Sequence, residues 1–124
     1  MGNPVAHFEI VAKDAPALRT FYGDIFGWQI GYSVPGAGLA DYTLVQTGSE
    51  SGIAGGIGEA PADGYSGHVT FYVEVPDVAQ ALEAVERRGG TRMMGPEQVP
   101  NGPLIGLFRD PGGNVIGVTQ SRSA

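Results

Sequence analysis

The chain contains two histidines, His7 and His68, and each lies in a segment with the residue pattern of a β-strand. An imidazole has an ordinary pKa of about 6.5, so it can accept a proton near neutral pH, and it is also the commonest metal ligand. Either role requires that the fold hold the ring in a defined place. His7 and His68 are therefore the candidate catalytic residues, and the elements around them decide where they lie.

The segment around His7 predicts a strand followed by a helix. Residues 5–11 alternate apolar and polar, as a half-buried strand does. Asp14 followed by Pro16 is typical of a helix start, and Gly27 is typical of a helix end. Apolar residues recur between them at helical spacing, at Leu18, Phe21, Tyr22, Ile25 and Phe26. Three further strands are predicted at 28–34, 42–47 and 52–58.

The segment around His68 repeats this order. A strand at 67–75 is followed by a helix that begins at Pro76-Asp77 and ends at Gly89-Gly90, with the same length as the first helix. Strands are then predicted at 91–94, 104–109 and 115–120. The chain is therefore predicted to be one domain of two β-α-β-β-β modules, at about 3–58 and 65–120, joined by a linker at 59–64.

Alternation along the first strand of each module predicts which side chains face the helices. The set predicted to pack on the helices is apolar: Phe8 and Ile10 in the first module, and Val69, Phe71, Val73 and Val75 in the second. The opposite set is His7, Glu9 and Val11, and His68, Thr70, Tyr72 and Glu74. Matching histidines therefore face one helix-free side of the sheet. Such a mixed polar and aromatic face predicts a cup that binds a small molecule.

Six aromatic residues are candidates for the lining of this cup: Trp28, Tyr32, Tyr42, Tyr65, Tyr72 and Phe108. Trp28 and Phe108 each border a helix or a core strand, so a place in the hydrophobic core is the stronger expectation for them. Tyr72 is the strongest candidate, because it shares the predicted face of His68.

Composition excludes several classes of protein. The 124 residues carry 13 acidic and 7 basic side chains, a net charge of −6, which leaves no positive surface for nucleic acid or anionic lipid. No cysteine is present, so disulfides, thiolate zinc sites and iron–sulfur clusters are excluded. The start of the chain lacks the charged and apolar segments of a signal peptide, and we expect a cytoplasmic protein with neither nucleic-acid nor membrane partners.

Four segments together resemble the vicinal oxygen chelate superfamily, which includes glyoxalase I, extradiol dioxygenases and bleomycin-resistance proteins. They are HFEI near the start, FYGDIFGW at the end of the first helix, GHVTFYVEV in the second module, and FRDPGGNVIGVTQ near the end. The resemblance covers nearly the whole chain and is strongest to a glyoxalase-like subgroup of mostly unassigned function. It implies an α+β fold in which two tandem β-α-β-β-β modules form a cupped mixed sheet with helices on the outer face. It also implies a homodimer.

Enzymes of that superfamily hold a divalent metal ion with one ligand from each of four strands. The resemblance places His7 and His68 at the two histidine positions. The carboxylate position in the last strand of the second module is Gly117, and a shift of 63 residues places its counterpart at Ala54. Neither residue has a ligand atom, so the resemblance implies only half of the metal set. No cofactor is therefore expected.

Three functions are compatible with these observations. The first is a small-molecule-binding protein that sequesters its ligand or catalyses a metal-free step; its ligand-binding residues are His7, Glu9, His68, Thr70, Tyr72 and Gly117. The second is a divalent-metal-dependent lyase or dioxygenase, with His7, His68 and either Glu9 or Glu74 as metal ligands. The third is a non-catalytic module that binds a protein partner. Bound metal distinguishes the first two, and a ligand that raises the melting temperature distinguishes both from the third.

Overall fold

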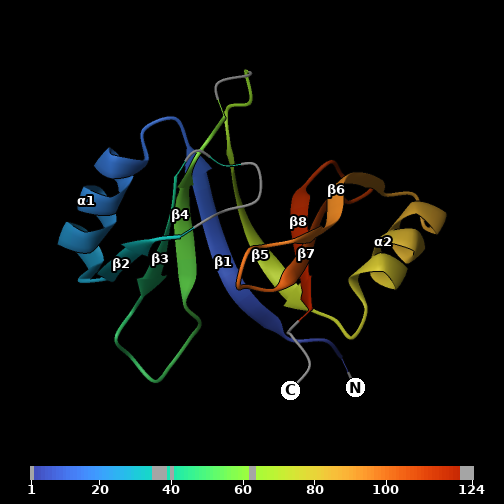
Figure 1. Cartoon of the computed structure of the whole chain (residues 1–124), viewed down its shortest axis with the longest axis horizontal. Coiled ribbons are helices and arrows are strands. Elements are labelled where there is room, and N and C mark those ends of the chain that lie inside the picture. Colours follow the sequence, from blue (N-terminus) through green and yellow to red (C-terminus); the bar gives the residue numbers. More distant parts are fainter. Residues whose placement is uncertain (1, 35–38, 40, 62–63, 121–124) are drawn as a thin grey trace. The chain divides into compact units, whose positions relative to one another are not determined.

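The computed structural model describes residues 2–34, 39, 41–61 and 64–120. They divide into two compact units: the first unit is His7–Val69, and the second unit is residues 2–6 together with 70–120. Each unit contains one helix packed against β-strands (Figure 1). Neither helix in this described part of the chain is long and apolar enough to cross a membrane.

The first unit is built on β1 (Val5–Ala12, from His7 onward), α1 (Ala15–Phe26), β2 (Gln29–Ser33), β3 (Tyr42–Gln46) and β4 (Gly55–Glu59). The strands lie in the order β2-β3-β4-β1, with β1 and β4 parallel and the other two pairs antiparallel. Helix α1 packs on this mixed sheet around three fully buried residues, Ala15, Val45 and Ile57, and Leu18, Tyr22 and Trp28 pack against them. Of the apolar face predicted for this helix, Leu18 and Tyr22 pack on the core of the first unit. The prediction was wrong for Phe21, Ile25 and Phe26, whose side chains are exposed.

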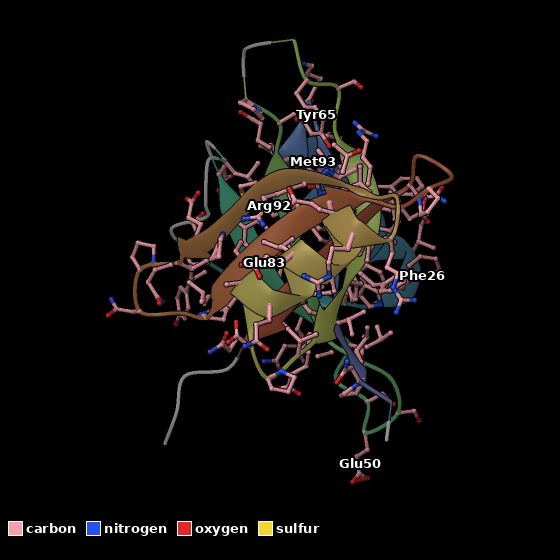
Figure 2. All side chains as sticks on the ribbon, turned by 90° about the vertical axis from the view of Figure 1, so that its right-hand side faces the viewer. Phe26, Glu50, Tyr65, Glu83, Arg92 and Met93 are labelled. Atoms are coloured by element: carbon pink, nitrogen blue, oxygen red, sulfur yellow. The ribbon has the colours of Figure 1, made fainter. Side chains whose placement is uncertain are left out.

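The second unit contains most of β5 (His68–Glu74), α2 (Val78–Arg87), β6 (Thr91–Gln98), β7 (Leu104–Arg109) and β8 (Val115–Gln120). The strands lie in the order β5-β8-β7-β6. Strands β5 and β8 are parallel, and the other two pairs are antiparallel. Helix α2 packs its buried Val78 and Leu82 against Val75 and Val118. Figure 2 looks onto α2 from its exposed side, with Glu83 on the helix and Arg92 and Met93 on the neighbouring β6. The chain is thus an α+β protein with two β-α-β-β-β modules, as predicted.

Both predicted helix starts are confirmed. The carboxylate of Asp14 accepts the backbone N–H of Ala17 at 3.1 Å, and Asp77 accepts that of Gln80 at 3.0 Å. Gly27 ends α1 with a φ of 68°, a left-handed conformation that glycine adopts without strain. The end of α2 differs from the prediction: its C-cap is Arg88, one residue before Gly89.

Two strands differ from their predicted extent. The predicted strand 91–94 extends to Gln98 and includes Pro96, which an edge strand tolerates because one side of it needs no backbone donor. The strand predicted at 52–58 begins only at Gly55. Val69 and Phe71 in β5 are exposed, whereas Val73 and Val75, the residue directly after the strand, pack on α2. The predicted apolar set is therefore only half covered, because the contacts of α2 are with the end of the strand.

Replacement of Asp77 by alanine is expected to lower the free energy of unfolding by about 1 kcal/mol, because one backbone N–H in the first turn of α2 loses its acceptor. Asp14→Ala should cost a similar amount through α1. Urea denaturation of the two variants measures both values. Equal stability of Asp77→Ala and the unchanged chain would contradict a capping role.

Candidate active site around two histidines

His68 reaches its position because two backbone segments of the first unit approach closely. Gly67, directly before it, has a φ of 111°, and a Cβ at this residue would collide with the backbone carbonyl of Val11 on β1. Only glycine adopts such a positive φ without strain and also lacks the Cβ that would collide. The start of β5 therefore lies against β1, and the imidazole of His68 contacts the side chain of Glu9.

Three side chains of the first unit form a continuous chain of hydrogen bonds. Nε2 of His68 is 2.5 Å from Oε2 of Glu9, and Nδ1 of His68 is 2.6 Å from the hydroxyl of Tyr65. The side chains of His68 and Glu9 are only 7% and 6% exposed, and Tyr65 is half-buried. The low local dielectric strengthens such bonds and makes an unpaired member costly. The carboxylate consequently holds the imidazole in one orientation.

His7 has a different partner. Its Nε2 is 2.8 Å from the hydroxyl of Tyr42 on β3, and the two rings are stacked with centroids 6.4 Å apart. Burial lowers the pKa of His7, and the negative charge of Glu9 raises it in part. Because burial is the larger effect, His7 is neutral at neutral pH.

The strand that carries Tyr42 is tied to α1 by an ion pair. Arg19 on α1 donates to Oδ2 of Asp41 at 2.8 Å, and the hydroxyl of Ser33 donates to Oδ1 at 3.0 Å. The hydrogen bond from Arg19, followed by that from Ser33, lowers the pKa of Asp41. Asp41 is therefore ionised over the physiological range and holds the residue next to Tyr42.

Gly117, predicted as a ligand-binding residue, is buried beneath an aromatic ring in the second unit. It lies opposite Tyr72 in the parallel pair β5–β8, and a Cβ on Gly117 would be 2.5 Å from that ring. Tyr72 itself is only 5% exposed. The tyrosine ring therefore occupies the space that a longer side chain at position 117 would need.

Strand register corrects the position predicted to correspond to Gly117 in the first module. Tyr72 lies four residues after His68, and the residue four after His7 is Val11, which is opposite Gly58. Gly58, not Ala54, is therefore the counterpart of Gly117. Ala54 precedes β4, and counting residues failed because the parallel pairs β1–β4 and β5–β8 have different sequence offsets.

Tyr42 covers this second position as Tyr72 covers the first. A Cβ on Gly58 would be 2.9 Å from the ring of Tyr42, and a Cβ on Gly56 would collide with the outer end of the same ring. Both places where superfamily enzymes carry carboxylates are thus glycines under tyrosine rings. In the part of the chain that the structure describes, no three His, Cys, Asp or Glu side chains converge into a metal-binding group. The four-ligand metal site of the superfamily does not fit these residues.

The remaining predicted site residues have structural contacts. The buried hydroxyl of Thr70 donates to the carbonyl oxygen of Val115 at 2.5 Å. The backbone N–H of Glu74 donates to the carbonyl oxygen of Pro4, within the second unit. The other predicted aromatics are distributed as follows: Trp28 and Phe108 pack against the two cores, and Tyr32 is 88% exposed. Tyr42 and Tyr65 were predicted only as lining, and their hydrogen bonds to the histidines were missed; the three-residue spacing of Tyr65 and His68 was the available signal for one of them.

The sequence model of the Glyoxalase/Bleomycin resistance protein/Dioxygenase superfamily matches residues 5–118. The chain belongs to this superfamily. A glyoxylase-like domain-containing protein from Didymella fabae is 28% identical over 118 residues, which cover 89% of this chain and 88% of the relative. The resemblance seen in the motifs is thereby confirmed, and it covers both modules.

Solved structures show the same superfamily fold. A methylmalonyl-CoA epimerase from Mycobacterium tuberculosis has a TM-score of 0.70 at 13% identity and covers 96% of this chain and 88% of its own. A hypothetical protein from Bacillus halodurans C-125 has a TM-score of 0.71 at 12% identity, and the match covers 100% of this chain and 98% of that protein. At such identities the likeness concerns the fold alone. Sites must be compared residue by residue.

The lowered pKa of His7 predicts a dependence of stability on pH. The unfolded chain binds a proton at His7 near pH 6.5, whereas the folded chain binds it only at lower pH. The free energy of unfolding should therefore fall as the pH drops below about 6.5, by at most about 1.4 kcal/mol per pH unit. His7→Gln should remove this part of the slope. Urea titrations between pH 7.5 and 5.5 measure it, and equal slopes in both proteins would contradict the assignment.

Proposed function

We propose that this chain is a small-molecule-binding member of the superfamily that works without the superfamily's metal ion. It sequesters its ligand or catalyses a metal-free step. The observation that supports this most is that both carboxylate positions are glycines, Gly58 and Gly117, beneath the rings of Tyr42 and Tyr72. A metal-ligating side chain at either position would have to displace a tyrosine. In this proposal His7, Glu9 and His68 contact the ligand, and the protein is a cytoplasmic homodimer.

The charge of the chain supports an uncharged or weakly charged ligand. Lys13 and Arg19 are the cations among the described residues of the first unit, and Arg19 is paired with Asp41. Among the described residues, Tyr42, Tyr65 and Glu9 form hydrogen bonds with the histidines. Such groups suit hydroxyl and carbonyl oxygens through neutral hydrogen bonds.

Two measurements on untagged protein test the proposal. Elemental analysis should find divalent metal at background, both in the unchanged chain and in a His7→Ala, His68→Ala double variant. A thermal-shift screen of neutral carbonyl compounds should yield a ligand that raises the melting temperature. Methylmalonyl-CoA, whose phosphates and carboxylate are charged, is added as the charged comparison, because a solved neighbour with a TM-score of 0.67 and 17% identity is a complex with it. Near-stoichiometric metal that disappears in the double variant would overturn the proposal.

A divalent-metal-dependent lyase or dioxygenase is the second candidate. The contact between Glu9 and His68 favours it, because a carboxylate and an imidazole at 2.5 Å are two donors that one cation could share. Glu9→Gln then discriminates, since it would lower the metal content if the cation were held there. If neither metal nor any small molecule binds, the chain is a non-catalytic module that binds a protein partner.

A further inference from the structure

The C-terminal half of α1 presents a patch of large apolar side chains to solvent. Phe21, Ile25 and Phe26 are 53%, 55% and 58% exposed, and they lie within two turns of the helix. The ring of Tyr22, which packs on the core, contacts the rings of Phe21 and Phe26, with centroids 5.1 and 6.0 Å away. The patch is therefore ordered, and contiguous apolar surface of this kind is typical of interaction sites.

Helix α2 shows that a β-α-β-β-β module does not require such a patch. Its capping residue, Asp77, corresponds to Asp14 of α1, so positions along the two helices can be compared directly. The residues of α2 that correspond to Phe21, Ile25 and Phe26 are Ala84, Arg88 and Gly89. A helix therefore covers the sheet of such a module with small or charged residues at these positions. The apolar residues of α1 have another role.

One carboxylate lies beside this patch, in a place where the helix dipole disfavours it. Asp24 is exposed in the last turn of α1, where a cation would be stabilised, and that turn contains no basic residue. Among the residues that the structure describes, no side chain forms a hydrogen bond or ion pair with this carboxylate. Phe21 lies one turn earlier on the helix. An acid next to an aromatic ring suits a guanidinium group, which pairs with the carboxylate and stacks on the ring.

The complementary groups lie at the C-terminal end of α2. Arg87 and Arg88 are exposed, and within the described part of the chain neither guanidinium forms an ion pair or hydrogen bond. The neighbouring Glu86 is already paired with Arg92 at 2.9 Å. Aromatic residues and arginine are the types enriched where interfaces derive most of their binding energy. A second copy of this chain supplies the group that each surface lacks.

We propose that the protein is a dimer in which the α1 patch, defined as Phe21, Asp24, Ile25 and Phe26, binds the C-terminal end of α2 of a second copy. Asp24 accepts hydrogen bonds from Arg87 or Arg88 of that copy, and the long arginine side chains cover the apolar residues. In a two-fold symmetric dimer this contact forms twice, because each copy offers both surfaces. The inference rests on the homodimer of the proposed function and specifies its surfaces.

Charge reversal tests the contact by sedimentation velocity of the untagged chain in low-salt buffer. Asp24→Arg should raise the dissociation constant of the dimer about tenfold or more, and so should Arg87→Glu combined with Arg88→Glu, because like charges then face each other. All three substitutions together should restore the dimer, although this variant is more negative than the unchanged chain, whose net charge is −6. Glu50→Arg, the same change of charge on an exposed hairpin residue, is the matched control and should not raise the constant.

A second variant tests the apolar part of the contact. Phe21→Ala combined with Ile25→Arg gives α1 the residues that α2 has at the corresponding positions. The variant should fold, as measured by circular dichroism, and should be monomeric. Asp24→Arg should fold too, because a cation in the last turn suits the helix dipole.

Three results would overturn the contact: a monomeric unchanged chain, a dimer that persists in Asp24→Arg or in the apolar variant, and a charge-reversed triple variant that stays monomeric. A dimer that none of the variants changes would leave the homodimer of the proposed function in place, with other surfaces. Near-stoichiometric metal in elemental analysis would instead overturn the proposed metal-free function and leave the contact standing. The two failures are therefore distinguishable.

Discussion

Replacing Glu9 by alanine should lower the free energy of unfolding by about 3 kcal/mol. The side chain is 6% exposed and accepts the Nε2–H of His68, whose own side chain is 7% exposed. Its removal leaves a buried donor without an acceptor and a cavity beside it. Glu9→Gln keeps an oxygen that can accept the same hydrogen bond, so it should cost only about 1 kcal/mol.

Urea denaturation at neutral pH measures these values, and Glu50→Ala is the matched control. Glu50 is exposed at the tip of the hairpin between β3 and β4 (Figure 2), so its removal should change stability by less than about 0.5 kcal/mol. If Glu9→Ala were no more costly than Glu50→Ala, the contact with His68 would not be part of the folded protein in solution.

Gly117→Ala should destabilise the chain by about 2–3 kcal/mol, although it adds only one methyl group. The new Cβ would be 2.5 Å from the ring of Tyr72, which is 5% exposed and cannot move without displacing its neighbours. Interiors are packed too densely to absorb such an overlap. The same substitution tests whether the ring of Tyr72 leaves room for any side chain at position 117, and therefore for a carboxylate there.

A double-mutant cycle isolates the contact. In a Tyr72→Val background the ring is absent, so Gly117→Ala should cost at least about 1 kcal/mol less than in the unchanged chain. Gly23→Ala is the control: a Cβ there meets its nearest atoms at an ordinary 3.7 Å, and alanine favours the helix. Additive effects of the substitutions at 72 and 117 would show that the ring does not occupy the space above Gly117.

Much of the fold followed from local patterns. The caps Asp14 and Asp77 and the helical spacing of apolar residues are signals within one or two turns of chain, and they located both helices correctly. The spacing did not determine burial, because Phe21, Ile25 and Phe26 of the predicted apolar face are exposed. Strands β7 and β8 have the predicted bounds, because turn residues delimit them on both sides. The extension of β6 through Pro96 was missed, since whether a strand is at the edge depends on its neighbours in space.

For the candidate site, too, some features followed from local sequence patterns and others depended on the tertiary structure. Alternation along two strands determined that His7 and Glu9 share a face, as do His68 and Tyr72, because side chains alternate strictly along extended backbone. It did not determine that Glu9 and His68, which are 59 residues apart, touch each other, nor that Tyr65 completes the chain of hydrogen bonds.

Tertiary structure also decided which glycine corresponds to Gly117. Residue counting pointed to Ala54, whereas the pairing of β1 with β4 places Gly58 there. The physical reason is the same in both cases. The sequence by itself determines which way a side chain points along its own strand, but contacts between distant strands depend on register. Register is set by backbone pairing and packing across the whole sheet.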